Sequence, residues 1–470
     1  MINYNINNKD LFEKIQSFDL IYNIQNYIPI FHNLVDNLDE NNINNINLET
    51  NKNVDILSIS YSDITCNINN NLTNIHCKYA PIIDPIRYMI GKYDNHEFTL
   101  PSLDNNKDDK YNIKIQRDNN NAYIDGFFSY LSSKLLGNGF IHGINFYGMF
   151  ICQHKEFKLN IVDDIEFLDK STFFHKNLNN LFFIDESIFE DDSNESGKKN
   201  NKLKLEDIDV CLDCEDIKLN SNIATTIKEE STTESVNIFN IDIEELTESI
   251  NINKNKKNKL SSSNDDSEED DSEEDDSDDD SSDISCIEAI IPNTPVLMIL
   301  MEKCNDTLDN LMLYSDISIE EWCGYLMQII MILITYQEKF QFTHNDLHTS
   351  NIMYVETDIK YLFYKYENKI YKVPTFNKIF KIIDFGRCIY NYNEKLFWSD
   401  SFCKDEDAHT QYNFGPFLDD NKPTINNNPS FDLSRLACSL YDYFDEYKFT
   451  KNKNSVELFN LIKKWCSDKN

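Results

Sequence analysis

Apolar and polar positions in the second half of the chain follow patterns that place a polar loop between strands. Apolar side chains recur at helical spacing over residues 322–340, which predicts a buried helix. Shorter apolar runs predict strands at 340–343, 352–355 and 379–383. The polar stretch 344–351 therefore joins two strands, and Asp384 follows the third strand directly.

The same periods occur in other parts of the chain. Helical spacing predicts helices at 123–136 and from residue 429 to about residue 444. Apolar runs of strand length predict further strands at 74–77, 144–152 and 296–301. Strands and helices are therefore expected on both sides of the chain's midpoint.

Three oxygen-bearing side chains lie at the ends of these strands. Asp346 is placed to orient a substrate hydroxyl and accept its proton, while Asn351 and Asp384 are placed to hold magnesium. Mg²⁺ prefers hard oxygen ligands and keeps some waters, so one carboxylate and one amide suffice beside phosphate oxygens. Gly386 gives the backbone after Phe385 conformational freedom. The spacing predicts a phosphoryl-transfer site, and ordinary loop carboxylates are the alternative.

The two motifs together resemble the protein kinase superfamily. Residues 344–351 match its His-x-Asp-x-x-x-x-Asn loop, and residues 384–386 match its Asp-Phe-Gly turn. In the order of its segments, the chain looks most like the divergent serine/threonine kinases encoded by large DNA viruses of the mimivirus type. The resemblance implies a kinase that uses ATP and Mg²⁺ to phosphorylate Ser or Thr hydroxyls of proteins. The implied catalytic residues are Asp346, His344 and His348, and the implied metal ligands are Asn351 and Asp384.

The resemblance also implies an α+β fold with two lobes. A small, β-rich N-lobe would comprise residues 51–185 and 293–303, and a mainly helical, truncated C-lobe would comprise residues 304–470. Residues 1–50 would form an N-terminal extension. Residues 186–292 would form a low-complexity acidic insertion that is largely disordered.

By the same resemblance, the residues after the strand at 296–301 would form the hinge of a nucleotide site. The backbone around Glu302 and Cys304 would hydrogen-bond adenine, with Met301 as gatekeeper. A core strand with an exposed end explains these residues equally well. Asp432 stands where kinases anchor the catalytic loop, although the helix dipole favours a carboxylate in the first turn of any helix.

The phosphate-binding side matches the superfamily less well. The first glycine is Gly91, so no glycine-rich loop precedes Lys78, the best candidate for the phosphate-binding lysine. Lys114 is the competing choice, and Lys78 is as readily explained as a surface lysine. The helix at 123–136 lacks the glutamate that kinases pair with this lysine. Asp125 is one methylene shorter, so a pair with Lys78 requires closer packing, and compensation of the helix dipole is the other explanation.

The charge of the chain is strongly negative and unevenly distributed. A net charge of -37 argues against general nucleic-acid binding, which requires Lys and Arg against phosphates. Residues 265–283 comprise fourteen acidic residues and otherwise only serine, which predicts disorder. Ser267, Ser272 and Ser277 each precede an acidic residue by three positions, the context that acidophilic kinases favour. Phosphorylation there by a host enzyme is one expectation, and a solvated segment without a partner is the other.

Cysteines and apolar segments give no sign of a disulfide framework or a membrane anchor. The chain has 12 cysteines, and Cys211 with Cys214 forms the sole CxxC pair, with no second pair to complete a zinc site. The N-terminus is polar rather than signal-like, and the most apolar helical stretch, 325–336, is too short to span a bilayer. We expect a soluble intracellular protein with reduced thiols and, if it is viral, a place in the host cytoplasm or the virion.

Three functions remain open: a protein kinase, a small-molecule phosphotransferase and a pseudokinase scaffold. His348 stands where protein kinases usually place lysine, which favours a phosphotransferase acting on a small hydroxyl compound. Only thirty-eight residues follow Asp432, too few for all the helices of a typical large lobe, which favours the scaffold. Asn345 replaces the arginine that pairs with a phosphorylated activation segment, so activity is expected not to depend on such phosphorylation.

Overall fold

The computed structural model describes residues 20–25, 27–34, 48, 54–59, 63–68, 71–93, 97–103, 108–184, 287–412, 425–446 and 453–467. All of them belong to one structural unit, formed by residues 1–184 and 237–470. Their fold is mixed α+β, with antiparallel sheets and several helices, as the sequence predicted. Within these residues, no helix is long and apolar enough to cross a membrane.

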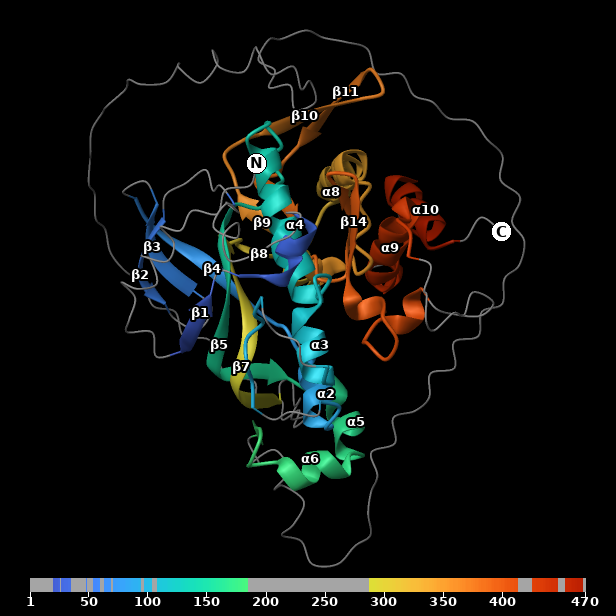
Figure 1. Ribbon diagram of the computed structural model, residues 1–470. Helices are drawn as coiled ribbons and strands as arrows, with labels where there is room; N and C mark the ends of the chain where they lie inside the picture. The colour runs from blue at the N-terminus through green and yellow to red at the C-terminus, as the bar shows by residue number, and fades with distance from the viewer. Residues whose placement is uncertain are drawn as a thin grey trace, which may run out of the picture. The chain divides into compact units, whose positions relative to one another are not determined.

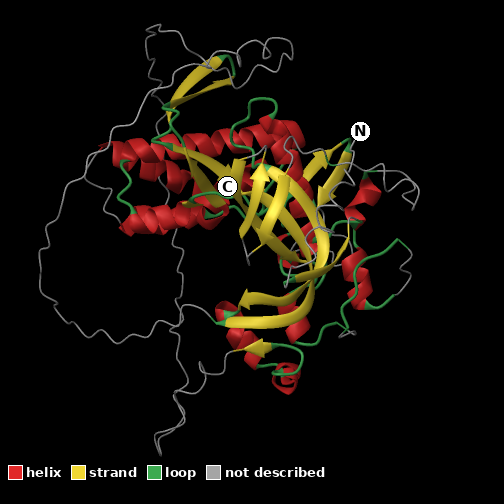
Figure 2. Cartoon of the chain, turned by 90° about the vertical axis from the view of Figure 1, so that its left-hand side faces the viewer, coloured by secondary structure: helices red, strands yellow, loops and turns green. Residues whose placement is uncertain are grey.

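The largest element is a seven-stranded antiparallel sheet (Figures 1 and 2). Its strands lie in the order β1-β5-β7-β4-β3-β2, and β6 pairs with β7. The strands are β1 (Ile21–Gln25), β2 (Val54–Ile59), β3 (Asp63–Ile68), β4 (Asn71–Pro81), β5 (Phe146–Asn160), β6 (Phe183–Ile184) and β7 (Glu288–Glu302). The predicted core strand at 296–301 is buried throughout and forms the end of β7, which pairs with β4 and β5 on either side.

The described helices come in two groups along the chain. The first group is α2 (Pro85–Met89), α3 (Lys110–Gln116), α4 (Asn121–Leu136), α5 (Ile165–Asp169) and α6 (Thr172–Asn177). The second group is α7 (Leu308–Tyr314), α8 (Ile319–Phe340), α9 (Pro429–Glu446) and α10 (Lys453–Cys466). Short 3-10 turns are η1 (Pro29–Asn33), η3 (Val162–Asp164), η6 (Thr349–Asn351), η7 (Asp400–Phe402) and η8 (His409–Gln411).

Helix α4 contacts the large sheet on one side and α8 on the other (Figure 1). The rings of Phe128, on α4, and Tyr336, on α8, have their centroids 5.2 Å apart. On the sheet side, Gly126 permits an unusually close approach. A Cβ atom at this position would lie 2.7 Å from Cδ2 of Leu297 and 2.8 Å from Sδ of Met149. The absence of a side chain therefore brings the backbone of α4 close to β5 and β7.

Helix α8 is the long helix that the apolar spacing at 322–340 predicted. It begins with a capping box, in which the Ser318 side chain accepts the N–H of Glu321 and the Glu321 carboxylate accepts the N–H of Ser318. Its Trp322 ring packs against Tyr443 and Phe444 of α9, with centroids 5.5 Å and 4.9 Å away. The helix ends at Gln341, whose φ of 48° is left-handed.

Three smaller antiparallel sheets are formed by strands between residues 306 and 398. β12 (Lys378–Ile382), β9 (Ile352–Glu356) and β8 (Asp306–Thr307) form a three-stranded sheet in that order. β10 (Tyr361–Tyr366) with β11 (Lys369–Pro374), and β13 (Ile389–Tyr392) with β14 (Lys395–Trp398), form two hairpins. The β10–β11 hairpin projects from the rest of the fold (Figures 1 and 2). Because β9 follows the 344–351 loop and β12 precedes Asp384, the pairing of these strands brings both polar segments to one place.

Three sequence expectations are corrected by the described residues. The strand predicted at 340–343 is wrong, because Phe340 ends α8 and only Thr343 forms an isolated bridge, with Ile389. Gln341 has a left-handed backbone conformation, which an extended strand does not allow. The stretch 1–50 is not wholly an extension, since β1 pairs with β5, and β7 begins at Glu288 rather than at 293. The expected disorder of 186–292 falls mainly outside the described residues.

Candidate active site

A buried carboxylate on α9 fixes the start of the 344–351 loop. Asp432 is fully buried and accepts the backbone N–H groups of His344 at 2.7 Å and Asn345 at 2.9 Å. Asn345 has a φ of 68°, a left-handed conformation that asparagine tolerates better than most residues. Burial raises the pKa of Asp432 to about 6, although His344 and the two backbone donors act in the opposite direction. The contact with the loop backbone that the resemblance implied for Asp432 is present.

The side chain of His344 connects this loop to the end of β12. Its Nε2 lies 2.9 Å from the carbonyl oxygen of Ile383, and its Nδ1 accepts the N–H of Asp346 at 3.3 Å. These contacts require the tautomer that carries its proton on Nε2. Because His344 is also fully buried, it acts on Asp346 through the backbone, as a positioning residue.

Asn351 and His348 contact each other across the same loop. Nδ2 of Asn351 donates to the carbonyl oxygen of Asp346 at 2.9 Å and lies 3.1 Å from Nε2 of His348. His348 therefore helps to orient Asn351. Since the amide nitrogen is directed at these two acceptors, the amide oxygen of Asn351 is the atom suited to hold a cation.

One ammonium group brings together three elements that are far apart in sequence. Nζ of Lys78, on β4, lies 2.7 Å from Oδ2 of Asp125, on α4, and 2.9 Å from Oδ1 of Asp384. The other oxygen of Asp125 accepts the N–H of Phe385 at 2.9 Å, so α4 also fixes the turn that carries Asp384. Lys78 is thus the lysine at this site, and Asp125 reaches it directly despite its short side chain.

The three charges shift one another's proton affinity. Burial alone would lower the pKa of Lys78, but Asp125 and Asp384 outweigh it and raise that pKa. Burial works to raise the pKa of Asp384, yet the ammonium of Lys78 holds it at about 2. The pKa of Asp125 is raised by burial in spite of Lys78. The Asp125 side chain is only 3% exposed whereas that of Asp384 is 48% exposed, so Asp384 is the carboxylate that can meet a cation from solvent.

A pocket of about 420 Å³ opens beside this cluster, within the usual size range of small-molecule sites. Lys78, Asp384 and Phe385 line one part of it, and the stretch from Met301 to Asp306 lines another. The residues implied as gatekeeper and hinge, including Cys304, therefore border the same space as Lys78. The N–H of Glu302 donates to the carbonyl oxygen of Asn145 at 2.9 Å, so that N–H is used within the protein.

Glu302 turns its side chain toward a buried lysine that sequence reasoning missed. Its carboxylate lies 2.7 Å from Nζ of Lys381, and its two oxygens accept backbone and side-chain N–H groups of Asn145, each at 2.9 Å. Lys381 also donates to the carbonyl oxygen of Gly143 at 2.6 Å. The pair connects the end of β7 to β12, just ahead of Asp384. A lysine inside the apolar run 379–383 was a signal for a buried partner.

A second ionic cluster holds the segment after β14 against the region before α4. Nζ of Lys114 lies 2.7 Å from Asp400 and 3.2 Å from Glu406, and NH1 of Arg117 lies 3.4 Å and 3.1 Å from the same two carboxylates. NH1 of Arg87 lies 3.5 Å from Glu406. Lys114 belongs to α3 and to this cluster, which corrects its choice as the competing phosphate-binding lysine. Nothing in the spacing of Asp400 and Glu406 identified them as its partners.

The carboxylate of Asp346 faces two arginines at the edge of a second pocket. Oδ2 lies 3.1 Å from NH1 of Arg387, and Oδ1 lies 3.6 Å from NH2 of Arg435, on α9. Arg387 also binds Asp407, through NH2 at 2.7 Å and Nε at 3.2 Å. The second pocket has a volume of about 370 Å³ and is lined by Asp346, both arginines, Asn345, Gln411, Phe431, Ser434 and Cys438. It shares no lining residue with the pocket beside Lys78.

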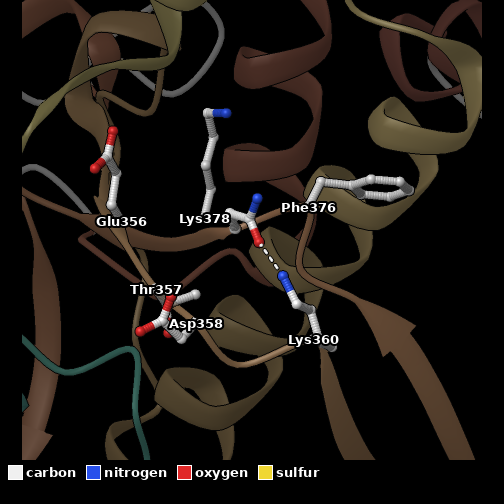
Figure 3. Close-up of a pocket in the computed structure, with 7 residues that line it drawn as sticks. Glu356, Thr357, Asp358, Lys360, Phe376 and Lys378 are labelled. Atoms are coloured by element: carbon white, nitrogen blue, oxygen red, sulfur yellow. Dashed lines mark hydrogen bonds between the residues drawn. The ribbon is translucent and has the colours of Figure 1, made fainter. Parts of the chain in front are cut away.

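A third pocket, shown in Figure 3, lies at the base of the β10–β11 hairpin. Lys360 crosses it to donate to Oδ1 of Asn377 at 2.9 Å, and Glu356, Asp358 and Lys378 are among its lining residues. None of its lining residues belongs to the other two pockets. Asp358 and Lys360 are exposed at this pocket.

Metal-binding capacity rests on few protein ligands. No group of three or more His, Cys, Asp or Glu side chains able to hold a metal ion occurs among the described residues. Asp384 and the amide oxygen of Asn351 fit Mg²⁺, which takes few protein ligands when phosphate oxygens and water complete its octahedron. The Cys211 and Cys214 pair lies outside the described residues. No protein-family model matches this chain, and no curated protein matches it.

Proposed function

We propose that this protein is an ATP- and Mg²⁺-dependent protein kinase that phosphorylates Ser or Thr hydroxyls. In this proposal the large sheet with α4 forms the N-lobe, and α7 to α10 with the smaller sheets form the C-lobe. The observation that carries it is the ammonium of Lys78, held between Asp125 and Asp384 beside a pocket of about 420 Å³. A lysine fixed by one buried carboxylate and one exposed carboxylate suits the phosphates and metal of a nucleotide.

In the proposed complex, different residues of the chain contact the adenine and the phosphates of the nucleotide. The adenine lies against Met301 and Cys304, and the phosphates extend toward Lys78. Asp125 keeps the ammonium of Lys78 in place when phosphate oxygens compete with Asp384 for it, because Asp125 remains buried on the far side. Asp384 and Asn351 are then free to hold Mg²⁺. The ion, when bound, neutralises charge that develops on the transferring phosphoryl group.

Asp346 accepts the proton of the attacking hydroxyl. Its position depends on its own loop, because His344 and Asn351 both bond to its backbone and Asp432 holds the preceding residues. This arrangement fixes the carboxylate without using its oxygens, which leaves them for the substrate and for the two arginines. Pre-organised placement of this kind is the main protein contribution to phosphoryl transfer.

A catalytically silent scaffold is the second candidate, and a specific observation favours it. Both oxygens of Asp346 lie within ion-pair distance of an arginine, at 3.1 Å and 3.6 Å. Guanidinium groups at both oxygens leave this carboxylate less accessible to the proton of a hydroxyl group unless the arginines are drawn elsewhere.

The test measures nucleotide binding and phosphoryl transfer separately. Equilibrium binding of ATP with and without Mg²⁺, and turnover with casein-type and small hydroxyl acceptors, are compared for wild type, Lys78→Met, Asp384→Asn and Asp346→Asn. Matched controls are Lys360→Met and Asp358→Asn, two exposed positions at the third pocket.

Each of the three variants is expected to lose a different property. Lys78→Met weakens ATP binding, Asp384→Asn removes its dependence on Mg²⁺, and Asp346→Asn keeps binding but lowers turnover by at least about a hundredfold. The controls behave as wild type. Mg²⁺-dependent binding without turnover by the wild-type chain would favour the scaffold, and absence of ATP binding would reject the kinase.

A further inference from the structure

The pocket in front of Asp346 is lined by two arginines in a protein that is strongly acidic overall. Its lining contains the guanidinium groups of Arg387 and Arg435 and only one carboxylate, that of Asp346. The net charge of the chain is -37. The lining residues carry one net positive charge, which Asp407 balances through its ion pair with Arg387. A pair of guanidinium groups in one lining still contrasts with the surface expected elsewhere.

Arginine is rare in this chain, and its placement is selective. The four arginines are Arg87, Arg117, Arg387 and Arg435, among 44 basic residues. Two of them belong to the ionic cluster with Asp400 and Glu406, and the other two face Asp346. Guanidinium binds carboxylates and phosphates through paired N–H donors, which an ammonium cannot do. Two such groups beside Asp346 indicate a site for an anion next to the reacting hydroxyl.

Arg435 has the capacity to bind such an anion. Its side chain is 49% exposed, and its contact with Asp346 is the long one of 3.6 Å. A guanidinium has five N–H donors, so most of those on Arg435 are not used by this contact. Arg387 is more firmly held, since Asp407 binds its Nε and NH2 atoms.

We propose that this pocket binds an acidic peptide whose Ser or Thr is flanked by Asp or Glu. The inference rests on the proposed function, whose acceptor class it specifies. Carboxylates of the peptide pair with Arg435 and Arg387 and draw these guanidinium groups away from Asp346. Asp346 is thereby freed to act as a base only when an acidic acceptor is present.

The chain itself contains a peptide of this kind. Residues 265–283 combine fourteen acidic residues with serine alone, including Ser267, Ser272 and Ser277. These serines, considered above as targets of a host enzyme, match the chemistry of the chain's own pocket. The sequence of this run is therefore the natural probe.

The transfer step balances with ATP as phosphoryl donor. The proton of the serine Oγ–H bond passes to the carboxylate of Asp346 as Oγ forms a bond to the γ-phosphorus. The bond between the γ-phosphorus and the β,γ-bridging oxygen breaks, and its electron pair leaves on ADP. Phosphoserine and ADP are the products, and the proton is released to solvent.

The test begins with binding in the absence of nucleotide. Fluorescence anisotropy compares a labelled peptide of residues 264–283 with a peptide in which every Asp is Asn and every Glu is Gln. The proteins are the wild-type chain, Arg435→Gln, Arg387→Gln and the control Lys360→Gln. A chain whose own run 265–283 carries the same neutral replacements removes competition in cis.

We expect the acidic peptide to bind about tenfold more tightly than the neutral one, with the difference shrinking as salt is added. Arg435→Gln should weaken acidic-peptide binding about fivefold and raise its KM without altering ATP affinity, while Lys360→Gln changes neither. With ATP and Mg²⁺, mass spectrometry should find phosphate on serines of the run 265–283 in wild type and less in Arg435→Gln.

Equal binding of the two peptides, or unchanged binding in Arg435→Gln, would overturn the inference. Preferential turnover of a phosphorylated monosaccharide would also overturn it, in favour of a small anionic acceptor. Failure of the proposed function would look different, because charge-dependent peptide binding would persist in a chain that transfers phosphate to no acceptor.

Discussion

The carboxylate of Asp125 lies 2.7 Å from the ammonium of Lys78, although aspartate is one methylene shorter than the glutamate that the kinase resemblance implied. The two residues come from α4 and β4, and the Asp125 side chain is only 3% exposed. Since the distance leaves no room for a longer side chain, Asp125→Glu should be harmful rather than restorative. We expect turnover to fall at least about tenfold and the free energy of unfolding to fall by about 1–3 kcal/mol. Steady-state kinetics and denaturant unfolding measure the two effects. Wild-type activity in the variant would show that α4 can shift enough to accommodate the longer side chain.

Gly126 supplies the physical reason for this close pair. A methyl group there would meet Leu297 at 2.7 Å and Met149 at 2.8 Å, so Gly126→Ala should push α4 away from the sheet. We expect destabilisation of about 1–3 kcal/mol and weaker ATP binding, because Asp125 moves with the helix. Adding Leu297→Val, which shortens one of the two contacting side chains, should recover part of the loss. Loss of stability without any change in ATP affinity would show that Gly126 does not determine the position of Asp125 at the ATP site.

The pKa of Asp432 predicts opposite effects of acid on stability and activity. Because burial raises this pKa to about 6 from the ordinary 3.8, the folded state holds its proton more strongly than the unfolded chain between these pH values. This group therefore favours folding increasingly as pH falls from about 6 toward 4, and the contribution is lost as pH rises through 6. Protonation also replaces an acceptor of the 344–351 loop, so activity should fall over the same interval.

The variant Asp432→Asn isolates this titration. Compared with wild type, its free energy of unfolding should lack the gain on acidification between pH 6 and pH 4, and its reduced turnover should lack the corresponding acid limb. Unfolding curves and initial rates at several pH values provide the measurement. Identical pH profiles for the two proteins would contradict the assignment.

Asp400 is the fully buried carboxylate of the ionic cluster after β14. It binds Lys114 at 2.7 Å, Arg117 at 3.4 Å and the N–H of Asn121 at 3.0 Å. Asp400→Asn would leave the buried ammonium of Lys114 undercompensated, with an expected cost of about 3 kcal/mol. Thermal unfolding compared with the exposed control Asp358→Asn measures it. A decrease in the unfolding temperature no larger than that of the control would mean that Glu406 alone compensates the charge of Lys114.

The residues around Asn345 predict that activity does not require phosphorylation between Gly386 and Asp432. The Asn345 side chain donates to the carbonyl oxygen of Arg387 at 3.0 Å and accepts from the hydroxyl of Tyr412, so its contacts are neutral. The carboxylates of Asp400 and Glu406 already supply negative charge for the cations of this region. Phosphatase treatment should therefore leave turnover unchanged. Loss of turnover together with loss of phosphate from this segment would refute the expectation.

Sequence reasoning succeeded for α8, because its long apolar pattern exceeds any competing period. The loop with Asp346 and the turn with Asp384 were recognised as contiguous motifs, and their catalytic role stays a prediction. The strand prediction at 340–343 was wrong because an alternation of only four residues is a weak signal, and these residues lie at the end of α8. Both the helix and the motifs could be read because their residues lie close together in the chain.

Ion pairs between residues that are distant in the chain could not be predicted from the sequence. The choice between Lys78 and Lys114 depends on which strand and helix pack beside Asp384, and no glycine-rich loop marked that strand. Arg435 reaches Asp346 only because α9 docks on the loop through Asp432. Such contacts follow from tertiary packing, which no local pattern encodes.

The four guanidinium groups lie either beside Asp346 or in the adjacent ionic cluster, and every other basic side chain among the 44 is a lysine. A dicarbonyl reagent selective for arginine, such as phenylglyoxal, is therefore a site-directed label for this protein without any substitution. Side-chain exposure falls from 49% at Arg435 to 33% at Arg387, 32% at Arg117 and 22% at Arg87, which sets the expected order of modification. The extent of modification at Arg435 and Arg387 then reports how far the region around Asp346 is open or occupied.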